Sequence, residues 1–447
     1  MIPAAPIWSE CQAPEYPRLS CGTLRTDVAV IGGGLAGLSA AYHLLGRLPG
    51  ARLVVLEARR IGAGASGRMT GLLGPGVGQS LPALVRRHGP VRAKALYVAT
   101  LRAVEDVCGL VAREGIDCEL EMTGQLVVAR SPAGRTRVAA LAALMKQLDL
   151  PGEALDDGAL NRAIRLAPYE HRSARGPSAL RLPLAGTLHP MRLLSGLAKC
   201  VTVRGGAIFE DARVTGIDDN RPVRLEIAGG GEIIADEVVV ATGAYTPSLG
   251  MLRGRILPVH LQVVATQPLE SRAREALGWK GREGVLDARR IFNYFRLTSD
   301  DRIVFGGGAP RYRWDGCTDE DRSSATALDR LAKELARTFP TEALVRVAGG
   351  WTGVIGYVRD ALPAIQRMRR RPSVLHVLGW CGHGLALSVA SGAWVTRLVC
   401  DGAAIEDLPW FRDNPPLIPF EPVRWLAVQA TVRIMSLLDK ITWRGQA

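Results

Sequence analysis

Four residues near the N-terminus have the types and the spacing needed to hold a dinucleotide. Gly32, Gly34 and Gly37 follow the pattern G-x-G-x-x-G, and Glu57 follows about twenty residues later. In this pattern the first glycine permits a tight turn and the second lets the backbone approach a pyrophosphate. The third lets a helix pack on a strand, and the acid accepts hydrogen bonds from a ribose. NAD and FAD both fit this much of the sequence.

The segments around these residues are those of a βαβ unit. An apolar strand, 27–31, precedes the glycines, and a second, 52–56, ends at Glu57. The helix between them carries an apolar stripe, whose residues are Leu38, Ala41, Tyr42 and Leu45. Its N-terminus offers free N–H groups and a partial positive charge to phosphates. The alternative, a glycine turn in an ordinary α/β domain, does not require all of these parts.

Further glycine-rich segments favour FAD over NAD. Residues 58–78 are rich in glycine and contain Arg68, and the strand 238–240 runs into Ala241, Thr242 and Gly243. Near the end of the chain, a strand at 374–378, a glycine turn at 379–384 and a helix at 385–399 repeat the strand–turn–helix order. An NAD-dependent dehydrogenase does not need this second unit, whereas a protein that holds the longer FAD does.

Composition narrows the remaining classes. The chain has 447 residues, 47% of them apolar and 22% charged, and a net charge of +13. This positive charge is either a basic surface for anionic partners or a bias towards arginine on solvated faces. We adopt the second interpretation and expect no nucleic-acid partner, because no basic run is interleaved with aromatic residues. The eight cysteines form no CxxC pair, so we expect no metal site. We also expect no signal peptide and a cytoplasmic protein whose thiols are free.

The rest of the chain alternates between predicted helices and strands. We expect an extended arm over 1–23 and helices within 81–118, 135–148, 185–201 and 319–339; strands at 124–129 and 256–266; a hairpin over 293–308 that turns at 299–301; and an irregular stretch over 169–184.

The sequence resembles the D-amino-acid oxidase/sarcosine oxidase superfamily of FAD-dependent oxidoreductases, and within it the gamma-glutamylputrescine oxidase-like branch. The matching segments are VIGGGLAGLSAAYHL (30–44), GASGR (64–68), LHPMRLLSGLA (188–198), VVVATGAYT (238–246), NYFRLTSDDRIVFGGG (293–308), GWTGVIGYVRDALPAI (350–365) and GWCGHGLALS (379–388). They occur in the family's order along nearly the whole chain.

This resemblance implies a mixed α/β (α+β) fold with two discontinuous domains. A Rossmann-like FAD-binding domain of the glutathione-reductase type would comprise 22–90, 185–250 and 345–405. A substrate domain on an antiparallel sheet would comprise 91–184 and 251–344, and 406–447 would be a C-terminal extension. The implied cofactor residues are Gly32, Gly34, Leu35, Ala36, Gly37, Glu57, Ala58, Arg59, Ala65, Ser66, Gly67, Arg68, Val214, Ala241, Thr242, Gly243, Gly379, Gly382, His383, Gly384 and Leu385.

The resemblance also implies the chemistry. A C–N bond of an amine or amino acid would be oxidised by hydride transfer to flavin N5, the imine would hydrolyse, and O2 would be the acceptor, forming H2O2. On the substrate side we name Tyr294 and Arg296, which share a face of one strand, and His260 and Gln262, which share a face of another. Arg296 suits a substrate carboxylate, and Trp351 would wall the cavity.

Departures from the branch keep two alternatives open. Met69 to Leu72 stand where the branch has Asn-Gly-Gly-Gln, Gln366 replaces a glycine, and Cys381 stands where serine is common. Cys381 is either a buried thiol or, less in keeping with the family's motifs, a covalent flavin attachment. The alternatives to an oxidase are a dehydrogenase that passes electrons to a quinone or partner subunit, and a catalytically silent FAD-binding assembly subunit.

The tail after residue 405 ends in a predicted amphipathic helix, 421–443. Trp425, Val428, Val432, Met435 and Leu438 lie on one side of it, and charged residues interrupt it too often for a membrane span. We expect it to dock on the protein's own body or on a partner subunit, or else to attach to the inner face of a membrane. The sequence leaves the oligomeric state open.

Overall fold

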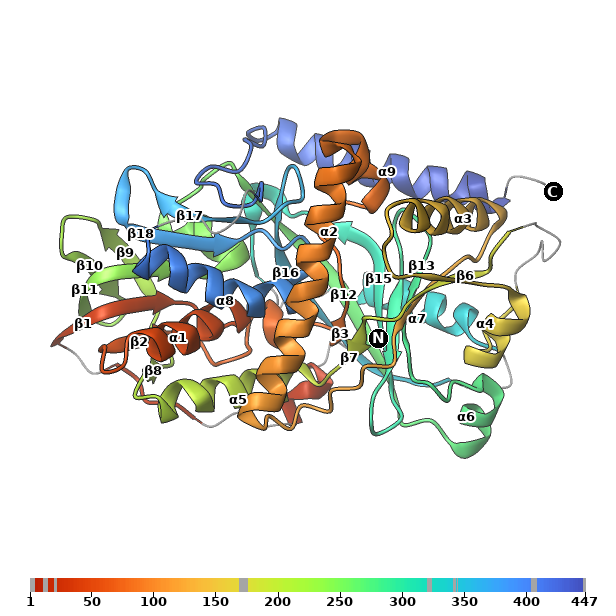
Figure 1. Cartoon of the computed structure of the whole chain (residues 1–447), viewed down its shortest axis with the longest axis horizontal. Helices are drawn as coiled ribbons and strands as arrows, with labels where there is room; N and C mark the ends of the chain where they lie inside the picture. The colour runs from red at the N-terminus through yellow and green to blue at the C-terminus, as the bar shows by residue number, and fades with distance from the viewer. Residues whose placement is uncertain are drawn as a thin grey trace.

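The computed structural model describes residues 5–10, 15–19, 22–168, 176–319, 324–340, 343, 345–402 and 408–444. Two eight-stranded sheets and a two-stranded ribbon make up the strands. The two sheets lie side by side along the long axis of the molecule (Figure 1). The predicted mixed α/β architecture is confirmed.

The first sheet is built around parallel strands. Its order is β17-β18-β11-β1-β2-β8, with β10 and β9 added beside β11. The strands from β18 to β8 in that order run parallel, whereas β17, β10 and β9 pair antiparallel. Their bounds are β1 Gly22–Ile31, β2 Leu53–Leu56, β8 Ala207–Phe209, β9 Val214–Asp218, β10 Val223–Ile227, β11 Gly231–Val240, β17 Ala364–Met368 and β18 Arg371–Leu378.

Both faces of this sheet are buried, which explains its unbroken apolar strands. In β1, Val28 and Val30 pack into the core with the helices, whereas Ala29 and Ile31 pack against apolar residues of β9 and β10. Helices α1 (Leu35–Arg47), α5 (Pro190–Val203) and α8 (Gly384–Cys400) cover the first of these faces. The long α2 (Leu81–Glu114) packs against α8 and bends at Gly89, just before Pro90.

The second sheet is almost wholly antiparallel. Its order is β16-β12-β15-β14-β13-β4-β6-β5, and only the pair β13–β4 is parallel. One face carries Val264, Phe295 and Phe305 and is covered by α7 (Ala325–Thr338). The bounds are β4 Gln125–Val128, β5 Glu153–Leu155, β6 Ala179–Leu182, β12 Ile256–Thr266, β13 Gly284–Asp287, β14 Tyr294–Leu297, β15 Ile303–Arg311 and β16 Val347–Val358.

Smaller elements complete the fold. The ribbon pairs β3 (Leu72–Leu73) with β7 (Gly186–Thr187), and the other helices are α3 (Pro132–Gln147), α4 (Asp157–Ala163), α6 (Ser271–Leu277) and α9 (Val423–Arg444). Short 3-10 turns are η1 Ile7–Glu10, η2 Ala65–Gly67, η3 Gly243–Leu249 and η4 Trp314–Gly316. Among the described residues, no helix is both long enough and apolar enough to span a membrane.

Some elements differ from the sequence-based expectations. The stretch predicted to be irregular contains β6, because its apolar residues pair with β4 and β5; residues 169–175 lie outside the described ranges. β16 was assigned to the FAD-binding domain but pairs with β12 in the second sheet. The part of α2 after residue 90 was assigned to the substrate domain, but the helix packs on the first sheet's helix α8. The remaining domain division stays a prediction.

Candidate functional site

The carboxyl ends of the parallel strands meet at one edge of the first sheet. There the Gly32 N–H donates a hydrogen bond to the Leu56 carbonyl (2.8 Å), and the Ala241 N–H donates to the Ile31 carbonyl (2.9 Å). Parallel pairing therefore places the glycine turn, Glu57 and the Ala241–Gly243 segment next to one another. This is where a ligand of an open parallel sheet is expected.

The glycines form a cradle that side chains would fill. Gly32 has φ +107°, and a Cβ there would lie 2.8 Å from the Ala241 carbonyl oxygen. A Cβ on Gly37 would lie 1.9 Å from the Gly32 carbonyl oxygen, so only glycine allows α1 to pack this closely on the turn. Gly34 caps α1, and the Leu35 N–H donates to the Ser66 hydroxyl oxygen (3.1 Å). The geometry fits the close approach of a pyrophosphate.

Glu57 is held at the end of β2 by backbone donors. Its carboxylate accepts hydrogen bonds from the Gly33 N–H (2.9 Å) and the Arg59 N–H (3.0 Å). Burial raises the pKa of this carboxyl, although both N–H donors oppose that shift. Val214 lies close to this end of the strand, since the Ala212 N–H donates to the Glu57 carbonyl. The carboxylate has the position expected for a ribose acceptor.

The loop after β2 joins the two sheets. Ala65, Ser66 and Gly67 form the turn η2. The Arg68 guanidinium donates to the Thr352 carbonyl (3.0 Å), and the Trp351 indole N–H donates to the Arg68 carbonyl (2.9 Å). This pair of hydrogen bonds fixes the loop against β16 of the second sheet.

The second glycine turn begins α8 at the same edge of the first sheet. Helices α1 and α8 pack side by side, and the Ser39 hydroxyl donates to the Val389 carbonyl between them. Burial lowers the pKa of His383, so its imidazole is neutral at neutral pH. Within the described part of the chain, its Nδ1 atom has no hydrogen-bond partner. His383 is therefore available to a ligand as a hydrogen-bonding group rather than as a cation.

Cys381 behaves as a buried thiol. Its Sγ donates to the Gly379 carbonyl (3.3 Å) and accepts from the Val358 N–H (3.4 Å). It packs among apolar residues, and burial raises its pKa to about 12. The thiol is thus protonated at neutral pH, which is the opposite of what a covalent attachment needs.

Three of the five substrate-side residues share the face of the second sheet that looks towards the first. Phe295 and Leu297 pack with α7, so the alternating neighbours Tyr294 and Arg296 lie on the other face. Trp351 belongs to the core around the first sheet and pairs in register with Val263 of the same face. These three side chains lie on the side of the Arg68 loop.

His260 and Gln262 lie on the opposite face. Gln262 pairs with Thr352, next to the Val263–Trp351 pair, so its side chain points to the opposite face from Trp351. This is the face of Val264, which belongs to the apolar cluster that includes residues of α7. The His260 Nε2 hydrogen-bonds the Cys317 carbonyl (2.8 Å), and both side chains are buried. The structure does not bring these two residues together with Tyr294, Arg296 and Trp351.

Arg296 is the most unusual side chain on the face towards the first sheet. It is 2% exposed, yet among the described residues its Nε and Nη2 atoms have no hydrogen-bond partner. Burial lowers its pKa to about 10, with Glu119 and Glu121 opposing the shift, so the guanidinium remains charged at neutral pH. Burying a cation whose N–H groups have no acceptor costs free energy, unless an anion binds and accepts hydrogen bonds from them.

Sequence reasoning missed the residues that surround Arg296. The guanidinium lies 5.4 Å from the ring centroid of Trp8, whose indole N–H donates to the Met69 carbonyl (2.8 Å). The Trp8 and His189 rings make an edge contact, with centroids 4.8 Å apart. The available signal for Trp8 was an aromatic residue in an arm that was predicted to be extended, whereas the structure places it in the turn η1. Glu119 carried no signal, because its proximity depends on the fold.

Comparison with known proteins identifies the family of this chain. Residues 27–398 match the sequence model of the family described as DAO, FAD dependent oxidoreductase. The chain is 29% identical over 431 residues to the gamma-glutamylputrescine oxidoreductase of Escherichia coli (strain K12), covering 94% of each chain. The resemblance inferred from the motifs is therefore confirmed.

Two solved structures share the fold. Glycine oxidase from Geobacillus kaustophilus superposes with a TM-score of 0.70 at 22% identity, covering 88% of this chain and 98% of that one. L-proline dehydrogenase from P. horikoshii gives a TM-score of 0.69 at 20% identity, covering 89% and 97%. The prediction of an FAD-dependent oxidoreductase that acts on amines or amino acids is confirmed at the level of the family. With FAD as its cofactor, the chain belongs to the DAO family of FAD dependent oxidoreductases.

Proposed function

We propose that this protein oxidises a C–N bond of an amine or amino acid. FAD, when bound, supplies the acceptor for the hydride that leaves the carbon beside nitrogen. The product imine takes up water and separates into a carbonyl compound and an amine or ammonia. O2 then takes the two electrons and two protons to form H2O2. The names of the similar proteins, which act on gamma-glutamylputrescine and glycine, support this class of substrate.

We propose that FAD lies along the edge where the two glycine turns meet. The ADP half would be held at Gly32, Gly34, Leu35, Ala36, Gly37, Glu57, Ala58, Arg59 and Val214. The remainder would be held at Ala65, Ser66, Gly67, Arg68, Ala241, Thr242, Gly243, Gly379, Gly382, His383, Gly384 and Leu385. The glycine cradle and the orphaned His383 Nδ1 support this assignment.

The observation that carries the substrate proposal is the buried Arg296. Its unpartnered Nε and Nη2 would be completed by a carboxylate of the substrate, in the fork geometry that suits a guanidinium. Trp8 lies against the guanidinium and would close the pocket on that side. The Trp351 indole N–H already donates to the Arg68 carbonyl. Its ring would therefore serve only as a wall of the pocket. Burial raises the pKa of Tyr294 to about 12, so its hydroxyl keeps its proton and can donate to the substrate.

The test compares Arg296→Ala with the parent enzyme on two matched amines, one with and one without a carboxylate. We expect KM for the carboxylate substrate to rise roughly ten- to a hundred-and-fifty-fold, because a hydrogen bond to a charged group contributes about 1.5–3 kcal/mol. The simple amine should change little, and Arg296→Lys should fall between. Equal effects on both substrates would contradict a carboxylate clamp.

The electron acceptor is tested separately. Steady-state turnover should release one H2O2 for each substrate oxidised. Rapid reduction of a quinone or dye without peroxide would instead establish the dehydrogenase. Anaerobic bleaching of the flavin absorbance by any amine in a panel would exclude the silent assembly subunit.

We propose a cytoplasmic location, with a further contact through α9 to a membrane surface or a partner subunit.

A further inference from the structure

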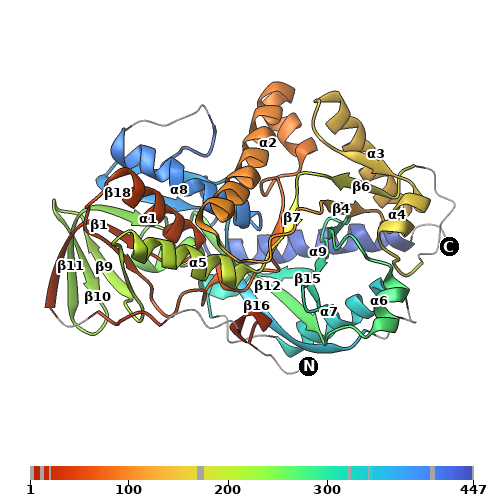
Figure 2. The same cartoon turned by 60° about the horizontal axis from the view of Figure 1, so that its bottom comes forward.

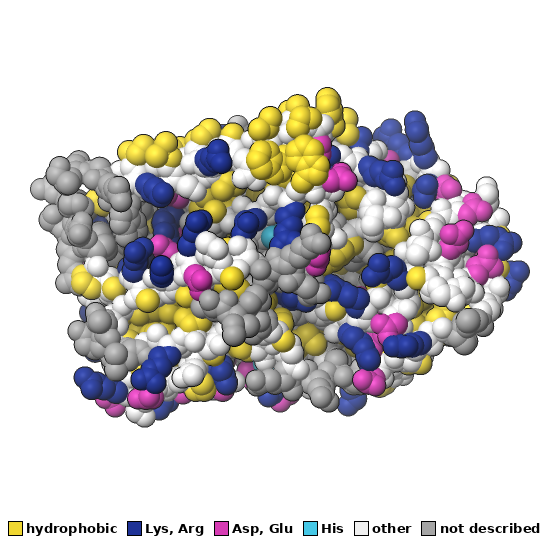
Figure 3. Space-filling view, turned by 180° about the vertical axis from the view of Figure 1, so that it is seen from behind, with side chains coloured by type: hydrophobic (Ala, Val, Ile, Leu, Met, Phe, Trp, Pro, Cys, Tyr) yellow, Lys and Arg dark blue, Asp and Glu magenta, His cyan; other side chains and the backbone are white. Residues whose placement is uncertain are grey.

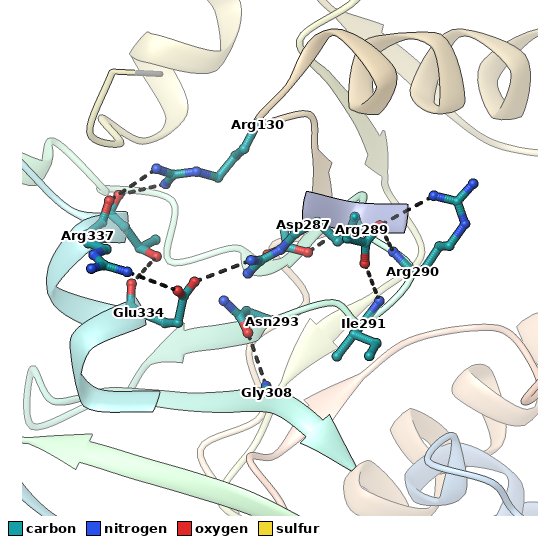
Figure 4. A network of polar contacts seen from close by, with 11 residues as sticks. Arg130, Asp287, Arg289, Arg290, Ile291, Asn293, Gly308, Glu334 and Arg337 are labelled. Carbon is teal, nitrogen blue, oxygen red and sulfur yellow. Dashed lines mark hydrogen bonds and ion pairs between the residues drawn. The ribbon is translucent and has the colours of Figure 1, made fainter. Parts of the chain in front are cut away.

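The C-terminal helix α9 is fixed to the body of the protein by polar contacts near both of its ends. The Asp439 carboxylate accepts hydrogen bonds from the backbone N–H groups of Arg290 (3.1 Å) and Ile291 (2.9 Å), two donors that Figure 4 labels. Near its start, the Tyr312 hydroxyl donates to the Glu421 carboxylate. Asp439 is 9% exposed although it is an acid on a surface helix. These contacts fix which side of the helix faces the protein.

The opposite side of α9 is apolar and exposed. Val423, Leu426, Ile434, Leu437, Leu438 and Ile441 are 39–57% exposed. Val423 and Leu426 are three residues apart, Ile434, Leu437 and Ile441 follow at three and four, and about two helical turns separate Leu426 from Ile434. Such a spacing places them on one stripe of the helix. The predicted stripe was only partly right: Trp425, Val428 and Val432 are half-buried, but Met435 and Leu438 are exposed. Helix α9 therefore carries apolar residues on its outer side as well as on its inner side.

The apolar surface continues before the helix. Leu417 and Phe420 are 59% and 74% exposed, and Trp314, 55% exposed, lies beside Trp425. In Figure 3 the apolar side chains gather along one edge of the molecule, which is the edge that α9 occupies in Figure 1. Figure 2 shows α9 running past the strands of the second sheet. A contiguous apolar surface of this kind marks an interaction site.

Charge favours one kind of partner. Arg433 and Lys440 flank the stripe on one side, and neither has an ion-pair partner among the described residues. The acid of α9, Asp439, points inwards, so the outward half of the helix carries basic and apolar side chains without an acidic one. If two copies met through α9, their basic flanks would face each other with no acid of the helix between them. An anionic bilayer offers both an apolar interior and negative headgroups.

We propose that α9 lies in the interface of an anionic membrane, with its apolar stripe among the acyl chains and Arg433 and Lys440 at the headgroups. The helix has 22 residues and is about 33 Å long, and polar contacts near both of its ends hold it against the body of the protein, so it would lie flat on the bilayer. Its polar contacts with the body hold the apolar side outwards without any rearrangement. This proposal is independent of which amine the enzyme oxidises.

The test is co-sedimentation of the full-length, FAD-loaded protein with vesicles of phosphatidylcholine alone or with added phosphatidylglycerol. We expect binding to the anionic vesicles that weakens as salt rises. The double variant Ile434→Glu/Leu437→Glu should bind at least tenfold more weakly. Arg433→Gln and Lys440→Gln should each weaken binding to anionic vesicles about fivefold.

The control places the same acids on exposed valines elsewhere. Val91→Glu/Val203→Glu, at positions 83% and 77% exposed, should bind as the parent does. Flavin absorbance and thermal midpoint show that each variant is folded. Failure of the parent to bind anionic vesicles would overturn the proposal, as would equal binding by Ile434→Glu/Leu437→Glu. A concentration-dependent dimer that this variant dissolves, without vesicle binding, would assign the surface to a second copy instead.

Discussion

The two sheets contribute to the site in different ways. The first offers main-chain groups: the glycine turns, the N-termini of α1 and α8, and Glu57, whose carboxylate is already bound by backbone N–H groups. The second offers side chains, and among the described residues Arg296 is buried with its Nε and Nη2 atoms unpartnered. The first sheet is thus complete as a binding surface for a fixed ligand. The second is complete only when a substrate occupies it.

This difference separates cofactor affinity from substrate affinity. A change at the first sheet should release FAD whatever the substrate, whereas a change at the second should alter KM while FAD stays bound. Arg296→Ala tests the second half of that statement. The variants below test the rest, in decreasing order of expected effect.

The largest effect is expected for Gly34→Val. The added side chain would enter the cradle beside Ser66, where even a Cβ would lie 3.0 Å from the Ser66 hydroxyl oxygen. The purified variant should be folded by circular dichroism but colourless. Gly109→Ala is the matched control, because a Cβ there meets nothing within 4 Å. Retention of FAD by Gly34→Val would show that the pyrophosphate lies elsewhere.

A smaller loss of FAD is expected for Glu57→Gln. Removing the charge while keeping an acceptor oxygen should weaken FAD binding about tenfold, or about 1.4 kcal/mol, measured by flavin fluorescence. Glu232→Gln, in an exposed ion pair of the same sheet, should have no effect.

The pH dependence checks the same residue. Burial raises the pKa of Glu57, so falling pH protonates it before an ordinary carboxyl. Ribose hydroxyls prefer the ionised form, and the parent should therefore lose FAD as the pH falls, whereas Glu57→Gln should change less. In the FAD-free protein the raised pKa affects stability in the opposite sense. As the pH rises through the pKa of Glu57 in the folded state, the buried carboxyl ionises and the free energy of unfolding falls. Identical profiles for parent and variant would mean that another group titrates.

Trp8→Leu should affect the substrate and spare the cofactor. It removes the ring beside Arg296 and the hydrogen bond to the Met69 carbonyl. A cation–π contact contributes about 0.5–2 kcal/mol, so KM for a carboxylate substrate should rise roughly two- to thirtyfold with FAD content unchanged. Trp8→Phe keeps the ring face and should recover most of the loss. If both variants lose FAD, Trp8 belongs to the cofactor site.

The smallest catalytic effect is expected for His260→Ala. This residue faces away from Arg296, so kcat/KM should change by less than about threefold. Loss of its hydrogen bond to the Cys317 carbonyl should lower the free energy of unfolding by about 1–3 kcal/mol. A hundredfold fall in kcat/KM with normal stability would show that the two faces of the sheet do not divide the roles in this way.

The contrast between the sheets also explains what the sequence could reveal. Main-chain binding demands glycine at fixed spacing, so the turns at Gly32 and Gly379 were visible, and parallel pairing brought them to one edge as expected. Side-chain sites depend on strand phase and on which strands pair. Tyr294 and Arg296 were correctly given a common face, but nothing in the sequence showed that His260 lies on the other one. Trp8 reaches Arg296 from nearly 290 residues away in the chain, a contact that only the fold creates.

The order of strands in the first sheet has a consequence for how the protein is made. β1 pairs along its length with β11, so that Gly22 lies beside Gly231, and β11 in turn pairs with β18 near the end of the chain. Between these strands the chain leaves to build part of the second sheet and returns. Pairings this distant make folding slow, because the chain must close long loops first. During synthesis, the first glycine turn therefore emerges early together with its neighbours Leu56 and Glu57, whereas Ala241 and helix α8 join it only much later.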